Sequence, residues 1–259
     1  MDTSVFESAF AAHKTEMLQA CWAGDLSWLQ QLYQTLNIQP EAKLDWMEKA
    51  HMSHTVFELF MTTIIHEHVP ILCYLLTMHP QMELDYEKVA RAIVDHPNLE
   101  IMKIIHAHHP NIVNLEFNTI ETFLTEACCG GQRHKPYTNM TVPLVHYLLD
   151  HGADPIEGCF AGCGALYPAL ESSLPLEIIV KMVQKGGVVN RPVLTMAMKK
   201  KRLDALEFFF QKAGFSCHYS IDQILEDARK SEDKEVMSVV TAGVPTLKKR
   251  QSRWWQFWI

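Results

Sequence analysis

Apolar residues recur three and four positions apart along most of the chain, in segments of about ten residues. In the clearest segment, the apolar run Leu144–Leu149 leads into Asp150 and His151 and stops at Gly152. Glycine takes the left-handed conformation that ends a helix, and Pro155, which follows shortly after, cannot continue one. The pattern therefore predicts a helix and a turn within Thr141–Pro155.

A pair of such helices, joined by a short turn, recurs seven times, and most copies are spaced about 30 residues apart. Two gaps are longer and carry inserts. Glu41–Ala50 predicts an extra short helix, and Cys129–Thr141 is rich in turn-forming and polar residues and predicts a protruding loop. The second helices of the seven copies begin near Asp25, His68, Asn98, Pro143, Leu176, Arg202 and Asp233.

The stretch Thr141–Pro155 resembles the second helix and exit of an ankyrin repeat, and the resemblance extends over roughly residues 14–243. The Thr-Pro-Leu-His signature of that family is absent, and Ala165–Leu170 comes nearest to it. The resemblance implies an all-α fold: an ankyrin-like helical solenoid of about seven helix pairs with two inserts. Another helical solenoid or an irregular helical bundle would use the same helices.

A helix pair with two apolar faces must stack on its neighbours, and the ends of the stack need polar caps. We expect a single repeat domain over residues 1–245, with an N-terminal cap at residues 1–17 in which Phe6 and Phe10 face inward. Residues 246–259 form a separate basic and aromatic C-terminal tail.

The composition is ordinary for a soluble chain: 48% of the 259 residues are hydrophobic and 20% are charged. No apolar run is long enough to span a bilayer, and Met1–Glu7 lacks the features of a secretory signal. Seven scattered cysteines favour reduced thiols and a cytoplasmic protein, with the nucleus as the alternative compartment. The net charge of −7 argues against a nucleic-acid partner, since phosphate binding needs a basic face.

No metal or cofactor is predicted. Cys159 and Cys163 form a lone C-x3-C pair, whereas a structural zinc site needs four ligands. His66 and His68 are two residues apart on a helix and so point to different faces. No Walker or dinucleotide-binding motif follows a predicted strand.

The ankyrin resemblance implies that the two residues after each Ala-Ala position of a first helix face a concave groove. The resulting column has an aromatic residue at one end, His and Asp in the middle, and basic residues at the other end. Its members are Trp22, Ala23, Ile65, His66, Asp95, His96, Cys129, Gly130, Glu171, Ser172, Lys199, Lys200, Arg229 and Lys230.

Two functions are compatible with this column. The first is a protein–protein interaction module that uses the groove together with the loop Gln132–Asn139. The alternative is an enzyme or small-molecule binder whose pocket is lined by Trp22 and Glu126. In that case His66 or His96 is the general acid or base and Asp95 orients it.

The basic segment Lys199–Arg202 suits an acidic peptide, a phosphate or a carboxylate ligand. The tail is the other unusual stretch, because basic residues precede Trp254, Trp255 and Trp258. Three interpretations of the tail stay open: folding back or self-association into a homo-oligomer, insertion into a partner's groove, and peripheral contact with a membrane surface.

Overall fold

A computed structural model describes residues 3–38, 40, 46–80, 82, 84–133, 140–158, 162–212 and 220–255. Side chains are described for residues 12–38, 40, 54–80, 82, 84–130, 140–158, 162–211 and 220–246. This part of the chain is helical, and its β structure is one isolated antiparallel bridge between Glu116 and Thr122. The predicted all-α class is confirmed.

The chain divides into two compact units, residues 1–112 (unit 1) and residues 113–259 (unit 2). The prediction of one domain over residues 1–245 with a separate tail stays a prediction.

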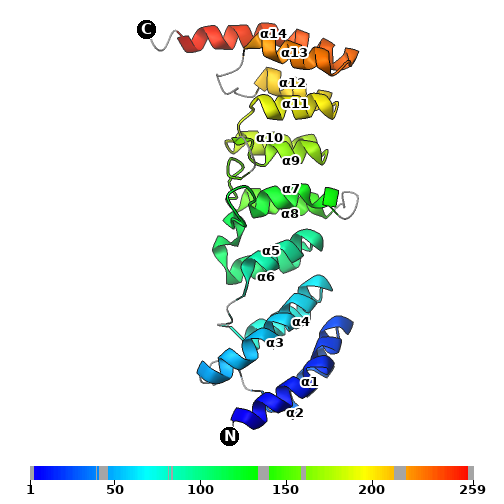
Figure 1. The fold of residues 1–259 in the computed structure, drawn as a ribbon, viewed down its shortest axis with the longest axis vertical. Coiled ribbons are helices and arrows are strands. Elements are labelled where there is room, and N and C mark those ends of the chain that lie inside the picture. Colours follow the sequence, from blue (N-terminus) through cyan, green and yellow to red (C-terminus); the bar gives the residue numbers. More distant parts are fainter. Residues whose placement is uncertain are drawn as a thin grey trace. The chain divides into compact units, whose positions relative to one another are not determined.

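Unit 1 contains three pairs of helices (Figure 1). We call α1, α3 and α5 its first helices and α2, α4 and α6 its second helices. The first helices pack on one another in order, α1 on α3 and α3 on α5, and α4 packs on α6. The bounds are α1 Thr3–Ala23, α2 Leu26–Thr35, α3 Trp46–Ile65, α4 Val69–Met78, α5 Tyr86–Asp95 and α6 Leu99–His108.

Unit 2 contains four pairs built in the same way, with α7, α9, α11 and α13 as first helices. First helices again pack on first helices and second helices on second helices, which buries apolar residues such as Leu148, Ala169 and Phe209 completely. A 3₁₀ helix, Pro110–Asn114, lies at the boundary between the units along the chain. The bounds are α7 Phe123–Arg133, α8 Thr141–Asp150, α9 Leu166–Glu171, α10 Leu176–Gln184, α11 Arg191–Lys199, α12 Leu203–Lys212, α13 Ile221–Lys230 and α14 Lys234–Trp255.

The turn from a first helix into its second helix has the same backbone form in both units. At the α1–α2 turn, Gly24 is left-handed, its N–H donates to the Cys21 carbonyl (3.4 Å), and the Asp25 N–H donates to the Ala20 carbonyl (3.0 Å). This pair of bonds is a Schellman motif, which satisfies the last carbonyls of a helix. A left-handed residue ends the first helix at Gly24, Glu67, Ser173, Lys201 and Glu232.

Three consecutive helices of unit 1 end in another way, at a His-Pro pair. A proline disfavours helical backbone in the residue before it, so the chain leaves the helix at the histidine. Each of these histidines still donates its backbone N–H to the carbonyl four residues earlier. The helices are α4, α5 and α6, and the pairs are His79-Pro80, His96-Pro97 and His109-Pro110.

Two predicted segments differ from the observed helices. Trp46–Ala50, assigned to an extra short helix, forms the first turns of α3, while residues 41–45 lie outside the described part. Residues 3–17 of the predicted cap are continuous with the rest of α1. The reason is the same in both cases: neither α1 nor α3 contains a Gly or Pro that would end a helix early. In the second insert, Cys129–Arg133 completes α7, and residues 134–139 are not described.

Candidate functional site

The C-terminal ends of the first helices of unit 1 form the first candidate surface. Trp22 is 64% exposed although it is a large apolar side chain, and Ile65 is exposed as well. His66 and Asp95 are exposed at the ends of α3 and α5, and His96 is half-buried. We call Trp22, Ile65 and His66 the aromatic surface.

Neighbouring rings hold Trp22 in place. Its indole meets the His66 ring edge to face, with the ring centroids 5.7 Å apart, and His66 stacks on His68 at 6.3 Å. The His68 Nε2 lies 3.0 Å from the Trp22 carbonyl oxygen, so the α3–α4 turn is bonded to the end of α1. Gly24 makes room for this histidine, since a Cβ there would lie 2.7 Å from the imidazole.

The predicted acid–base group His66, Asp95 and His96 is placed at the ends of α3 and α5. Within the described part of the chain no hydrogen bond or ion pair joins any two of them. Nor do the described residues contain a group of three or more His, Cys, Asp or Glu able to hold a metal ion. The catalytic role of these three residues stays a prediction.

Glu126 was expected to line the same pocket as Trp22. It lies in the first turn of α7, in unit 2, where it is only 5% exposed, and its role in a pocket stays a prediction. Its backbone N–H donates to the Thr122 carbonyl, and Thr122 and Thr125 cap the start of the helix through reciprocal hydroxyl bonds. The side chain of Glu126 is thus part of a buried helix start.

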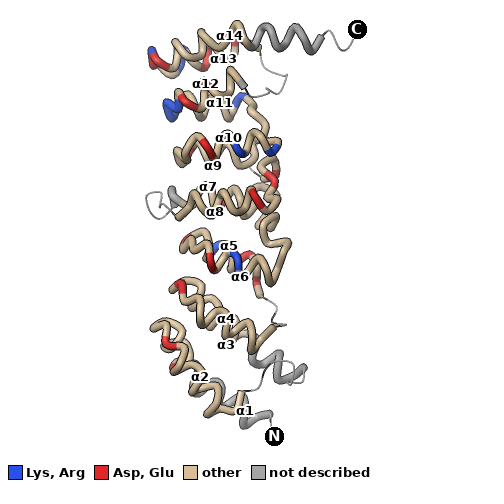
Figure 2. The backbone as a smooth tube through the Cα atoms, turned by 180° about the vertical axis from the view of Figure 1, so that it is seen from behind, with Lys and Arg blue, Asp and Glu red and all other residues tan. Residues whose placement is uncertain are grey.

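The ends of the first helices of unit 2 form a second candidate surface, with a basic character. Lys199, Lys200, Arg229 and Lys230 are exposed at the ends of α11 and α13, and Glu171 is half-buried at the end of α9. Figure 2 shows these basic ends along the same edge of unit 2, coloured blue. The helices α9, α11 and α13 pack on one another in that order.

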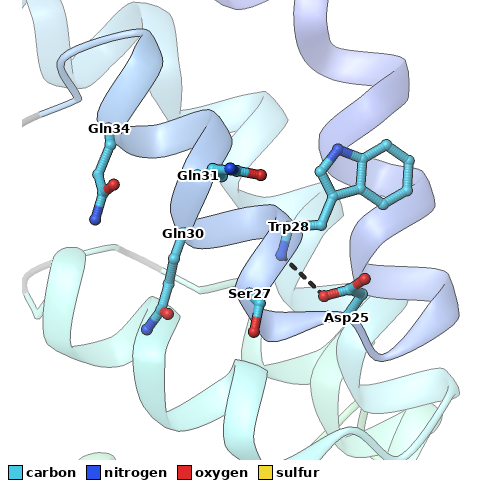
Figure 3. Close-up of a pocket in the computed structure, with 6 residues that line it drawn as sticks. All are labelled: Asp25, Ser27, Trp28, Gln30, Gln31 and Gln34. Carbon is cyan, nitrogen blue, oxygen red and sulfur yellow. Dashed lines mark hydrogen bonds between the residues drawn. The ribbon is translucent and has the colours of Figure 1, made fainter.

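An open hollow of about 490 Å³ lies along α2 (Figure 3). Asp25 caps this helix by accepting a hydrogen bond from the Trp28 N–H at 2.8 Å. No sequence pattern predicts this hollow, because amide side chains at helical spacing are common on solvated faces. Its lining is Asp25, Ser27, Trp28, Gln30, Gln31 and Gln34.

Sequence reasoning also missed a buried polar pair in unit 1. The Tyr33 hydroxyl lies 3.2 Å from His79 Nε2, and both side chains are buried. Burial lowers the pKa of His79 to about 4 and raises the pKa of Tyr33. Burial also raises the pKa of the nearby Cys21 thiol to about 11, although a hydrogen bond with Thr63 acts to lower this pKa. These groups are neutral near pH 7 and closed to solvent, so they support the fold.

Other predicted contact residues fall wholly or partly outside the described part. The backbones of Trp254 and Trp255 belong to α14, but their side chains are not described, and Trp258 lies beyond it. The side chains of the loop Gln132–Asn139 are not described either. Cys163 is buried, and Cys159 is not described.

No family model matches this chain, and no curated protein matches it. Among the described residues, no helix is long and apolar enough to cross a membrane.

Proposed function

We propose that the chain is a protein–protein interaction module built as an ankyrin-like helical solenoid. It binds a partner protein through the ends of its first helices. The observation that carries this proposal is the exposure of Trp22, 64%, on a side chain whose ring packs edge to face on His66. Tryptophan is enriched among the residues that dominate binding energy at protein interfaces.

The repeated architecture supports the solenoid part of this proposal. In each unit, first helices stack on first helices, and a left-handed residue closes the first helix of five pairs, at Gly24, Glu67, Ser173, Lys201 and Glu232. Such stacks present one equivalent position per repeat along an edge, and the side chains at that position are free to differ. Here the position of Trp22 and Ile65 in unit 1 corresponds to that of Lys199 in unit 2.

The alternative, an enzyme or small-molecule binder, has weaker support. It needs Asp95 to orient His66 or His96, and no hydrogen bond between them is found in the described residues. The hollow along α2 contains none of the three. A protein partner in the cytoplasm or nucleus therefore fits the exposed aromatic surface better than a small substrate does.

The test is selection of a random peptide library on the full-length protein. We expect selected peptides that bind Trp22→Ala about 30-fold more weakly, the loss typical of an interface hot spot. Met140→Ala is the matched control, since Met140 is an exposed apolar residue of unit 2 (45%) whose side chain makes no capping bond. It should leave binding unchanged.

Two outcomes would overturn the proposal. The first is a selection that yields no binding peptide. The second is a set of peptides whose affinity is the same for wild type, Trp22→Ala and Met140→Ala, which would remove the aromatic surface as a binding site.

A further inference from the structure

The basic residues near the ends of α11 and α13 fall into two groups: those that pair with an acidic side chain and those that do not. Lys201 lies 2.7 Å from an Asp233 carboxylate oxygen, and the Lys230 Nζ lies 2.8 Å from Glu226. Arg202 pairs with Asp204 and also donates to the Leu174 carbonyl at 2.7 Å. These three cations therefore have structural partners.

The other three cations, Lys199, Lys200 and Arg229, have no such partner among the described residues. All three are exposed, and within the described residues none of them forms an ion pair or a side-chain hydrogen bond. In a chain with 30 acidic and 23 basic residues, an acidic partner for each would be easy to supply. We call these three residues the unpaired basic surface.

Complementing the helix dipole does not explain the unpaired basic surface. A cation in the last turn stabilises the negative C-terminal end of a helix, and this holds for any helix. Yet α1, α3 and α5, which end at the equivalent point of their pairs, have no basic residue in the last turn. Among the first helices whose last turn is characterised, α11 and α13 have Lys or Arg there.

The two helices that carry the unpaired basic surface are held firmly against each other. Arg191 at the start of α11 makes a two-bond pair with Asp227 of α13, with N–O distances of 2.7 and 2.8 Å. The Asp227 side chain is only 10% exposed, and Thr195 also donates to it. Their packing and this pair join α11 to α13, the two helices at whose C-terminal ends the cations lie.

We propose that the unpaired basic surface binds an acidic segment of a partner protein. This inference rests on the proposed function and specifies the partner's chemistry. Carboxylates of an extended peptide would supply the charges that Lys199, Lys200 and Arg229 lack within the described chain. Arginine in particular binds a carboxylate through two parallel N–H groups.

Two other anionic partners are less suited to this surface. A nucleic acid requires many phosphate contacts, and here three unpaired cations stand on a chain of net charge −7. A membrane surface favours basic residues beside inserted apolar side chains. The large apolar side chains exposed in the described part, namely Trp22, Ile65, Met140 and Ile156, do not lie on α11 or α13.

The experiment uses the full chain and its matched charge variants. A random peptide library is selected on the wild-type protein, and the enriched peptides are measured against Lys199→Glu/Lys200→Glu. The control, Lys103→Glu/Lys185→Glu, makes the same change in net charge at two other exposed lysines. Binding is measured at low and high salt, and each acidic peptide is compared with its Glu→Gln and Asp→Asn version.

We expect a class of acidic peptides that bind Lys199→Glu/Lys200→Glu about tenfold more weakly and bind the control like wild type. Their affinity should fall with added salt and be lost in the amide version, while Arg229→Glu should weaken the same peptides. Thermal unfolding of both double variants should match wild type, because all four lysines are exposed.

Three results would overturn the inference. Enriched peptides that are not acidic, or that ignore Lys199→Glu/Lys200→Glu while still depending on Trp22, would remove the acidic partner and leave the proposed function standing. Tighter binding to a single-stranded oligonucleotide or to phosphatidylserine vesicles, lost in the same variant, would assign the surface to a different partner. A selection with no binding peptide would remove the proposed function as well.

Discussion

The helices of unit 1 and unit 2 are joined by different mixtures of polar contacts, although an ion pair between Lys14 and Glu58 joins α1 to α3 in unit 1. In unit 1 the connections include neutral groups. Tyr33 and His79 are joined inside the core, and the His68 ring reaches the Trp22 carbonyl. Asn98, which caps α6, donates to a carboxylate of the α3–α4 turn at 3.0 Å.

In unit 2 ion pairs join several of the described helices. Arg191 and Asp227 connect α11 to α13. Lys181 of α10 lies 2.7 Å from Asp150, at the end of α8, and hydrogen bonds hold the pKa of that carboxyl below its usual range. Paired helices can thus be held together by either kind of group, but the two units should respond differently to pH and salt.

The largest effect should come from emptying the core of one unit at a time. Phe60→Ala removes a completely buried ring from unit 1, and Phe209→Ala does so in unit 2. Each should cost about 3–5 kcal/mol in the free energy of unfolding. Hydrogen exchange read peptide by peptide should show faster exchange mainly in the unit that carries the substitution. Equal acceleration in both units for both variants would mean that the chain unfolds as one body and that the division has no energetic meaning.

A smaller effect should follow from acid, and it should appear first in unit 1. The pKa of His79 is lowered by burial from 6.5 to about 4. Between these two pH values His79 binds a proton in the unfolded chain but stays neutral in the folded chain. The free energy of unfolding should therefore fall as the pH drops from 6.5 towards 4, by about 2 kcal/mol at pH 5. Exchange rates corrected for the intrinsic effect of pH would measure it.

His79→Gln is the control for this pH effect, because glutamine is polar and does not titrate. It should remove most of the acid sensitivity of unit 1 between pH 7 and pH 5. If His79→Gln and wild type lose the same stability, other groups are responsible and the buried pair is not the cause.

The smallest effect should come from the ion pairs of unit 2. Asp227→Asn keeps the shape of the side chain and removes its charge, and we expect a loss of about 1 kcal/mol because Arg191 remains partly exposed. The Arg191 guanidinium holds the pKa of Asp227 below its usual range, so this contribution is present above that range and is lost at lower pH than the effect of His79. Denaturation at rising salt should narrow the gap between variant and wild type. A gap that salt leaves unchanged would mean that the pair acts through packing.

Much of the fold follows from local signals. The apolar spacing predicts the helices, and Gly24 and Gly152 stand where helices end in the left-handed conformation. The longer spacing between the first two copies predicts an insert with its own short helix over Glu41–Ala50, although no residue after Trp46 interrupts α3. The spacing of apolar residues alone does not predict where a helix begins or ends when no residue interrupts it.

The candidate site was only partly predictable. Trp22 aligns with Ile65 and Ala23 with His66, so the sequence register places Trp22 and His66 at the ends of adjacent first helices, where they meet. The direction of Asp95 and His96 is set by the backbone that leaves α5 before Pro97, which the register does not specify. The pair Tyr33 and His79 lies 46 residues apart and depends on burial from several helices, so no local pattern predicts it.

The left-handed turn that closes the first helices has a consequence for how such a chain can change over time. Its two bonds join backbone groups only, and the position accepts glycine, glutamate, serine and lysine in different copies. A non-glycine residue there costs about 1–2 kcal/mol in backbone strain, which the packing around the turn offsets. Mutation can therefore replace the residue at the most regular point of each repeat while the shape survives. Copies of one ancestral unit could then accumulate substitutions until their sequences no longer align, although their turns keep the same backbone form.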